Sequence, residues 1–328
     1  MEKRDFGNTG LAVSRLTFGC GAVGGLMTKG DAADQDRAIH WARDHGINFF
    51  DTAASYGDGI SEDNLGRALN GNKDGLVVST KVGIGNADLG DVGGAIRRSL
   101  EASLKRLRLD HVDIFQLHNT LGRADFRGNL TIDQVMDAVV PAFDKLRDSG
   151  KVRFLGFTAK GEPDDVHRLI GSGVFRSAQV FYNLLVPSAG EVVPAGHPAD
   201  DFRQLLDVAA DHGVGAIGVR VLAGGALSGS EKRHLLGMAV VTPIGSDSDY
   251  KSDVERARQF LPLVEAGHVD SLPELAIRYA ISHPALPTTE IGIATLDELQ
   301  QATAAVNKGP LSLEALAQIK NVQAGFVI

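Results

Sequence analysis

Four side chains with complementary chemistry follow apolar segments in the first part of the chain. Asp51 and Tyr56 come at and just after the end of one such segment, Lys81 ends the next, and His118 ends the one after that. Short apolar runs of this kind are typical of buried strands. Because parallel α/β proteins assemble their chemistry at the carboxyl ends of strands, we expect the four side chains to converge. Each alone has an ordinary explanation as a turn, core or surface residue, but together they predict a site.

The four residue types together predict proton transfer. A phenol has an ordinary pKa of about 10, too high for efficient proton exchange near neutral pH. An ammonium such as that of Lys81 lowers the pKa of a neighbouring phenol, and a carboxylate keeps the lysine charged and oriented. An imidazole can position a carbonyl oxygen. The set therefore predicts a general acid for reducing a carbonyl, or a general base for oxidising an alcohol. It supplies no hydride, so a cofactor is required.

Two other kinds of site fit the sequence less well. A hydrolase would pair Asp51 with a second strand-end carboxylate. Glu62 is the candidate for that carboxylate, while Asp113 is expected in the middle of a strand. A metal site would need clustered ligands, but the histidines are scattered without ligand spacing. We therefore expect no metal.

Composition restricts the class of protein. The chain has 328 residues, 43% of them apolar, with a net charge of −8 and a pI of about 5.7, which disfavours nucleic acid as a partner. A lone cysteine, Cys20, excludes an intramolecular disulfide. The amino terminus is charged, and the most apolar long window, 213–229, contains Arg220 and is shorter than the ~20 residues of a membrane span. We expect a soluble, cytoplasmic protein without a membrane partner.

Short apolar strands alternate with amphipathic helices along the whole chain, which predicts a parallel sheet covered by helices. A turn at Asn8-Thr9-Gly10 indicates a small hairpin before the first strand. The expected strands are 16–20, 47–51, 76–81, 112–118, 152–157, 178–181, 216–219 and 290–293, and the expected helices are 32–45, 61–69, 92–107, 131–149, 163–171, 200–212, 254–267, 272–283 and 296–307. No linker divides residues 1–328, and the glycines at 19–25 do not open a helix as a dinucleotide-binding fingerprint would. We predict a single (β/α)₈ barrel.

These motifs, taken in order, resemble the aldo-keto reductase superfamily over nearly the whole chain. The resemblance is carried by Gly7-Asn8-Thr9-Gly10-Leu11, Phe50-Asp51-Thr52-Ala53 with Tyr56-Gly57, Ser79-Thr80-Lys81, Leu107-Arg108-Leu109-Asp110, Gln116-Leu117-His118 and Gly150-Lys151-Val152-Arg153. It implies a catalytic tetrad in which Tyr56 exchanges the proton, Lys81 and Asp51 support it, and His118 orients the substrate. The implied activity is hydride transfer between NAD or NADP and a small carbonyl or alcohol substrate.

The positions that would hold the cofactor depart from the family pattern. Thr158-Ala159 stand where Ser-Asn is usual, and Val219 replaces a common tyrosine, with Arg220 beside it. Residues 222–229 resemble the loop that binds the pyrophosphate. The resemblance places cofactor contacts at Thr158, Gln179, Arg220, Leu222, Gly224, Leu227, Gly229, Ala294 and Glu298.

The region after the last strand bears on the choice of cofactor. Residues 292–298 contain no Lys or Arg, whereas family members commonly use a basic residue there for the 2′-phosphate of NADP. Asp297 or Glu298 would instead accept a hydrogen bond from a ribose hydroxyl and repel a phosphate, which favours NAD. Alternatively, these acids only begin the last helix, where the helix dipole favours them. Arg220 could also serve as an anion clamp for NADP.

The sequence indicates less about the substrate than about the fold, the tetrad or the cofactor. Residues 56–62 and 183–188 are similar to family branches that contain aldose 1-dehydrogenases and pyridoxal 4-dehydrogenase. Asn119, Arg123 and Arg127 follow His118 and either line a pocket for a polar substrate or lie on the surface. Residues 230–250 are a lid or an interface. A cofactor-sensing binding protein with little turnover is the alternative function, and the oligomeric state is not predicted.

Overall fold

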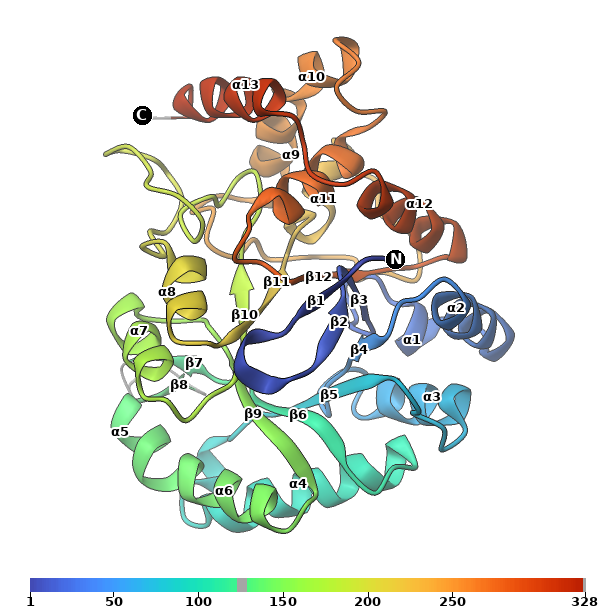
Figure 1. Ribbon diagram of the computed structural model, residues 1–328, viewed down its shortest axis with the longest axis vertical. Helices are drawn as coiled ribbons and strands as arrows, with labels where there is room; N and C mark the ends of the chain where they lie inside the picture. The colour runs from blue at the N-terminus through green and yellow to red at the C-terminus, as the bar shows by residue number, and fades with distance from the viewer. Residues whose placement is uncertain (123–128, 327–328) are drawn as a thin grey trace.

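The computed structural model describes residues 1–122 and 129–326, and its centre is a closed barrel of eight parallel strands (Figure 1). The barrel strands are β3 (Leu16–Gly19), β4 (Phe49–Asp51), β5 (Val77–Val82), β6 (Val112–Leu117), β9 (Val152–Thr158), β10 (Ser177–Phe181), β11 (Gly215–Val219) and β12 (Thr288–Gly292). Each pairs in parallel with its neighbour, and β12 closes the ring on β3. The predicted (β/α)₈ barrel is confirmed.

Helices surround the barrel in the ring visible in Figure 1. They are α1 (Leu26–Lys29), α2 (Ala32–Asp44), α3 (Ile60–Leu69), α4 (Val92–Leu107), α5 (Ile132–Gln134), α6 (Val140–Asp148), α7 (Pro163–Gly171), α8 (Leu205–Asp211), α9 (Tyr250–Arg258), α10 (Leu261–Glu265), α11 (Leu272–Ser282), α12 (Leu296–Asn307) and α13 (Leu313–Ala324). The shorter elements are η1 (Gly7–Thr9), η2 (Asn86–Asp88), η3 (Val135–Val139), η4 (Ala223–Ser228), β7 (Thr120–Leu121) and β8 (Asn129–Leu130). Polar side chains begin several helices: Asp91, Ser271 and Ser312 each accept a backbone N–H of the first turn.

Two predicted helices differ from those observed, for local reasons. The helix expected from residue 200 begins at Leu205, because Arg203 and Gln204 both have positive φ angles. The helix expected over 254–267 is divided into α9 and α10, with Pro262 in the first turn of α10, where its missing N–H costs nothing. Helix α13 and the one-turn helix α1 were not predicted.

The amino-terminal hairpin closes one end of the barrel. Strands β1 (Lys3–Asp5) and β2 (Ala12–Ser14) pair antiparallel, as predicted, and lie over the centre of the ring in Figure 1. The Asn48 side chain ties the hairpin to the barrel, since its oxygen accepts the Ser14 N–H at 2.7 Å and its nitrogen donates to the Ala12 carbonyl at 2.9 Å. Beneath the hairpin lies a compact apolar cluster made of Phe6, Leu11, Val13, Phe49, Val77, Ile114 and Ile217. This end of the barrel is therefore a packed core.

The opposite end, where the strands finish, is lined by polar side chains and crossed by residues 230–249, which we call the strap. The strap contacts segments that follow three different strands. Arg233 donates to the Val23 carbonyl after β3 at 3.3 Å and to the Gly224 carbonyl after β11 at 2.6 Å. The Gly245 carbonyl accepts the N–H of Asp200, in the loop after β10, at 2.7 Å. The segment that the sequence left as a lid or an interface thus lies across the mouth of the barrel.

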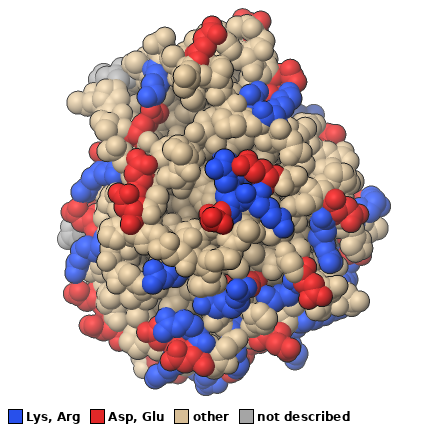
Figure 2. Space-filling view, in the orientation of Figure 1, with Lys and Arg blue, Asp and Glu red and all other residues tan. Residues whose placement is uncertain are grey.

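Charged side chains of both signs are interspersed over the face seen in Figure 2, with no extended area of one sign. No helix within residues 1–122 and 129–326 is long and apolar enough to cross a membrane.

Candidate active site

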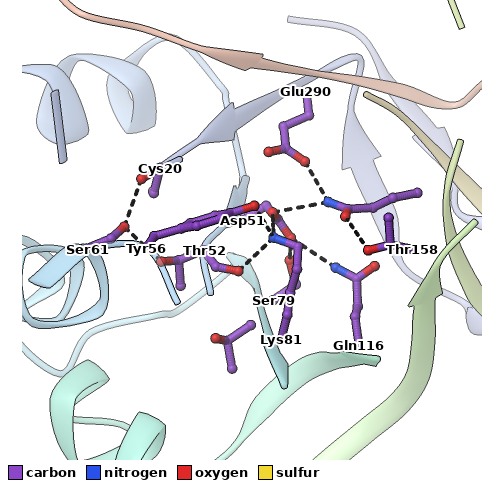
Figure 3. Close-up of polar contacts among 12 residues, drawn as sticks. Cys20, Asp51, Thr52, Tyr56, Ser61, Ser79, Lys81, Gln116, Thr158 and Glu290 are labelled. Atoms are coloured by element: carbon purple, nitrogen blue, oxygen red, sulfur yellow. Dashed lines mark hydrogen bonds and ion pairs between the residues drawn. The ribbon is translucent and has the colours of Figure 1, made fainter. Parts of the chain in front are cut away.

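Lys81 is the centre of the polar network at the carboxyl end of the barrel (Figure 3). Its side chain is fully buried, on β5 beside β4 and β6. The ammonium has three N–H donors, and all three have acceptors. It forms an ion pair with Asp51, donates to the Thr52 carbonyl at 2.8 Å and donates to the Tyr56 oxygen at 3.1 Å. Only the charged ammonium form of Lys81 has the three N–H groups that these three acceptors require.

Asp51 is held as a carboxylate by four donors. Lys81 and Gln179 donate to one of its oxygens, the latter at 3.2 Å, while the Ser79 hydroxyl and Gln116 donate to the other, the latter at 3.0 Å. Burial is the largest single influence on the pKa of Lys81 and lowers it, but the negative charge and hydrogen bond of Asp51, together with the neighbouring Tyr56 and Glu290, raise the pKa above its ordinary value. Lys81 is therefore charged at neutral pH and remains paired with Asp51.

The Tyr56 phenol faces this ammonium and the imidazole of His118. Lys81 Nζ lies 4.7 Å from the centre of the Tyr56 ring, and the His118 ring meets it edge-on at a centroid distance of 5.9 Å. Burial raises the pKa of Tyr56 to about 12, although Lys81 lowers it through its charge and its hydrogen bond. The expected effect of the lysine is present, but burial exceeds it. Tyr56 is therefore a neutral phenol in the protein without cofactor.

His118 is a neutral imidazole at physiological pH. Burial lowers its pKa to about 3, and the positive charges of Lys81 and Lys160 add to the effect. Because a neutral ring carries one N–H, His118 can donate a single hydrogen bond to a substrate oxygen without bringing a charge. The structure thus brings together all four residues of the predicted tetrad.

The alternative pair for a hydrolase is not formed. Thr80 lies on the opposite face of β5 from Ser79 and Lys81, because side chains alternate along a strand. Glu62 is on that opposite face, where it accepts from the Thr80 hydroxyl at 2.5 Å and from Arg106 Nε at 2.7 Å. One Glu62 oxygen is therefore engaged by a hydroxyl and the other by an ion pair, on the face of β5 away from Asp51.

The sequence analysis missed an acidic residue of this network, Glu290 on β12. Its carboxylate accepts a hydrogen bond from Gln179 Nε2 at 2.8 Å, and the same nitrogen donates to Asp51 (Figure 3). Burial and the charge of Asp51 raise the pKa of Glu290 well above its ordinary value. A charged residue within an otherwise apolar barrel strand, the kind of signal that singled out Lys81, could have found Glu290. Gln116 and Ser79 were likewise not assigned a role.

Thr158 and Gln179, predicted to contact the cofactor, lie opposite each other on the neighbouring strands β9 and β10. The Thr158 hydroxyl donates to the Gln179 amide oxygen at 3.1 Å, and both side chains are buried beside the tetrad. Their donors are engaged within the protein, and the remaining lone pairs of the Thr158 and Gln179 oxygens suit the N–H groups of a carboxamide.

Arg220 and the glycine-rich turn after it form the second predicted cofactor region. Among the described residues, the Thr242 carbonyl at 3.4 Å is the acceptor found for the Arg220 guanidinium, which is partly buried. The turn η4 contains Gly224 and Gly225 with φ angles of 68° and 111°, and a Cβ at Gly224 would lie 2.8 Å from the Arg220 guanidinium. A partly buried cation with donors to spare beside a glycine turn fits an anionic group such as a pyrophosphate. Leu222, Leu227 and Gly229 belong to this turn region.

Ala294 and Glu298 meet at the start of α12. Glu298 accepts the Ala294 N–H at 2.6 Å, while its own N–H is accepted by the Thr295 hydroxyl at 3.2 Å. Asp297 accepts from Gln301 at 2.7 Å. Both acids therefore have a local role in the helix start, as the alternative interpretation expected, and each retains a second carboxylate oxygen for a ligand.

Of the residues considered for the substrate pocket, Arg123 and Arg127 lie outside the described part of the chain. The Asn119 side chain is buried and bonds the backbone of Ile84, accepting its N–H and donating to its carbonyl at 2.8 Å each. Asn119 therefore fixes the loop after β5.

Comparison with known sequences decides the family: the Aldo/keto reductase family profile matches residues 15–324. The chain belongs to the aldo-keto reductase family. It is 28% identical to L-galactose dehydrogenase of Arabidopsis thaliana, over 94% of this chain and 89% of that protein. It is 28% identical to L-glyceraldehyde 3-phosphate reductase of Escherichia coli K12, over 97% and 91%. It is 27% identical to a probable voltage-gated potassium channel subunit beta of Arabidopsis thaliana, over 95% and 93%.

The fold agrees with a solved member of the family. The holo form of an aldo-keto reductase from Bacillus halodurans superposes with a TM-score of 0.73 at 24% identity, covering 98% of this chain and 96% of that one. Membership of the family makes this aldo-keto reductase an NAD(P)-dependent oxidoreductase.

The Lys81–Asp51 pair gives a test on the free protein. Asp51→Asn should lower the free energy of unfolding by about 3–5 kcal/mol at pH 7, because it leaves a buried ammonium without its counter-ion. The double variant Asp51→Asn, Lys81→Met, which removes both charges, should be more stable than this single variant. Urea unfolding of both proteins is the measurement. A double variant less stable than Asp51→Asn would show that the loss is not due to an uncompensated charge.

Proposed function

We propose that this aldo-keto reductase transfers a hydride between a nicotinamide cofactor and an aldehyde, a ketone or a sugar hemiacetal, with Tyr56 as the general acid and base. The observation that carries the proposal is the hydrogen bond from Lys81 to the Tyr56 oxygen at 3.1 Å. Because that bond occupies a lone pair of the phenol, the proton of Tyr56 must point elsewhere. Among the described residues no acceptor for this proton lies within hydrogen-bonding distance, so it is available to a substrate oxygen.

In the direction of reduction, the carbonyl oxygen of the substrate takes hydrogen bonds from Tyr56 and His118. The neutral His118 orients the oxygen, and Tyr56 gives up its proton as negative charge develops there. The bound nicotinamide supplies the hydride. Lys81 then faces a phenolate and stabilises it by direct attraction, while Asp51 keeps the ammonium in place. In oxidation the same phenolate accepts the proton of the alcohol.

Thr158, Gln179, Arg220 and the η4 turn support the proposed cofactor site. The hydroxyl and amide of Thr158 and Gln179 lie beside the tetrad, where the reactive ring must be. Arg220 and the η4 turn can donate hydrogen bonds to phosphate oxygens at the mouth of the barrel, further from the tetrad. We assign the carboxamide to the first pair and the pyrophosphate to the second region, with Leu222, Leu227 and Gly229 shaping the turn.

For the cofactor we propose NAD over NADP. Residues 292–298 contain no basic side chain, and Asp297 and Glu298 bring two carboxylates to the start of α12, which would repel a 2′-phosphate. For the substrate, the relatives named as L-galactose dehydrogenase and L-glyceraldehyde 3-phosphate reductase support a sugar or a related hydroxyaldehyde.

Tyr56→Phe tests the proposed acid and base. The variant should lower kcat by a factor of about 10²–10⁴, because a proton-transfer group is lost, while cofactor affinity stays unchanged. The control is Tyr182→Phe, which removes the hydroxyl of a buried tyrosine whose ring stacks on Tyr279, away from the tetrad. Steady-state kinetics and cofactor titration are measured on both variants.

Two outcomes would contradict the proposal. A Tyr56→Phe protein with full turnover would remove Tyr56 from the chemistry. A wild-type protein that binds cofactor tightly but turns over no aldehyde, ketone or sugar would favour the alternative function, a cofactor-sensing binding protein. The similarity to a probable potassium channel subunit beta is consistent with that alternative.

The cofactor preference is tested by separate calorimetric titrations with NADH and NADPH. We expect NADH to bind at least about tenfold more tightly, equivalent to about 1.4 kcal/mol, because of charge repulsion between the 2′-phosphate and the acids of α12. Tighter binding of NADPH would contradict this preference and would assign the phosphate contact to Arg220 or another base.

A further inference from the structure

The Glu290 side chain packs against a glycine of the neighbouring strand. Glu290 lies on β12 next to Thr17 of β3, and its carboxylate points into the polar end of the barrel (Figure 3). Gly19 lies two residues further along the neighbouring strand, opposite Gly292. A Cβ at Gly19 would lie 2.9 Å from the Ile291 carbonyl oxygen and 3.0 Å from both Cγ and Oε1 of Glu290. The backbone of β12 and the Glu290 side chain together therefore leave no room for a side chain at position 19.

The charges around Glu290 do not balance in the free protein. Lys81 provides one positive charge, which Asp51 already neutralises by direct contact. Among the described residues no lysine, arginine or histidine lies within ion-pair distance of Glu290, and its hydrogen-bond donor is the neutral amide of Gln179. A second carboxylate beside Asp51 without its own cation is unfavourable. Glu290 therefore keeps its proton while Asp51 remains ionised.

Gln179 couples the two carboxyl groups. Its Nε2 carries two hydrogens, one donated to Asp51 Oδ2 at 3.2 Å and one to Glu290 Oε2 at 2.8 Å. Its oxygen accepts from Thr158, so the orientation of the amide is fixed. Glu290 is thus linked by one rigid side chain to the ion pair that supports Tyr56.

We propose that Glu290 is a further functional residue of this site, and that it releases its proton to solvent when the positively charged, oxidised nicotinamide binds. This inference rests on the proposed function. The reacting carbon of the cofactor must come within about 3–3.5 Å of the substrate carbon. The oxygen on that substrate carbon accepts a hydrogen bond from Tyr56. Thr158 and Gln179 are the assigned contacts of the ring, and Gln179 touches Glu290. The oxidised ring therefore brings to Glu290 the cation that the free protein lacks.

The reduced nicotinamide is uncharged and gives no such compensation. Glu290 should therefore keep its proton when NADH binds and lose it when NAD⁺ binds. The titratable groups near Glu290 are Asp51, Lys81, Tyr56 and Cys20. Burial raises the pKa of the Cys20 thiol, and the negative charge of Asp51 raises it further. Of these groups, Glu290 is the acid without a cation of its own.

The sign of the pH dependence follows from linkage. The pKa of Glu290 is raised in the free protein and falls when NAD⁺ binds, so binding releases a proton in the interval between the two values. NAD⁺ affinity should therefore rise with pH over that interval, by up to about tenfold per pH unit, and NADH affinity should not. Above that interval the ionised Glu290 favours the oxidised cofactor, which biases this enzyme toward oxidation of an alcohol or hemiacetal.

Calorimetry of the full chain measures this proton directly. NAD⁺ and NADH are each titrated at several pH values in two buffers of different ionisation enthalpy. We expect close to one proton released per NAD⁺ within the interval and none per NADH. Glu290→Gln, which keeps an acceptor for Gln179, should abolish the release and the pH dependence of NAD⁺ affinity, and should lower the ratio of NAD⁺ to NADH affinity about tenfold.

Two variants serve as controls. Glu191→Gln removes a carboxylate that bonds Tyr279 at 2.9 Å and Lys320 at 3.1 Å, outside the site, and should release the same proton as the wild type. Tyr56→Phe should also retain the release, which excludes the phenol as its source. If Glu290→Gln does not fold, the difference between NAD⁺ and NADH in the wild type still tests the proposal.

Equal proton release with NAD⁺ and NADH, or undiminished release in Glu290→Gln, would overturn the role of Glu290 and leave the oxidoreductase function intact. Loss of the release in Tyr56→Phe would assign the proton to the phenol and would equally overturn it. Absence of binding by either cofactor would overturn the proposed function itself, and with it this inference.

Discussion

The ion pair between Lys81 and Asp51 is the interaction on which the rest of the site depends. A lysine buried in a barrel is unfavourable unless its charge and all three of its donors are satisfied. Asp51, the Thr52 carbonyl and the Tyr56 oxygen satisfy them, and four donors in turn fix Asp51. Tyr56 is thus held in place because its oxygen accepts one of the three N–H groups of the buried lysine. A change to any of these partners would disturb the phenol.

One end of the barrel is a packed apolar core that stabilises the fold, and the other end carries the polar side chains of the site. At the hairpin end, Phe6 and its neighbours fill the barrel with apolar side chains, which gives the strands a rigid base. Two residues further along three of these strands the inward side chain is polar: Asp51 follows Phe49, Ser79 follows Val77 and Gln116 follows Ile114. Because each strand spans both layers, the packed end fixes the height at which Asp51, Lys81 and Gln179 project. The strap then covers the polar end and brings Arg233 and the Thr242 carbonyl toward the η4 turn.

Much of this arrangement could be predicted from the sequence, for physical reasons that are visible in particular residues. The eight barrel strands are short apolar runs, and the helix starts at Val92, Pro163 and Leu296 follow clear local signals. The tetrad was predicted because polar residues that end apolar strands are conspicuous. By contrast, the break between α9 and α10 and the start of α8 at Leu205 depend on local backbone geometry, which hydrophobic periodicity does not indicate.

The charge balance could not be predicted in the same way. Whether a pKa rises or falls depends on the sum of burial and of every neighbouring charge. The sequence suggested that Lys81 would lower the pKa of Tyr56, whereas burial raises it to about 12. Glu290 comes from the last strand of the barrel, and only ring closure brings it beside β3 and the tetrad. Long-range contacts of this kind are set by topology, so local sequence patterns do not contain them.

Neutron diffraction of the deuterium-exchanged protein would test the central claim most directly, because it locates the protons of the Lys81–Tyr56 pair. We predict three deuterons on Lys81 Nζ, directed at Asp51, the Thr52 carbonyl and the Tyr56 oxygen, and one deuteron on Tyr56 that points away from Lys81. A neutral Lys81 amine that accepts the deuteron of Tyr56 would contradict the account, because the phenol would then have no proton available for a substrate.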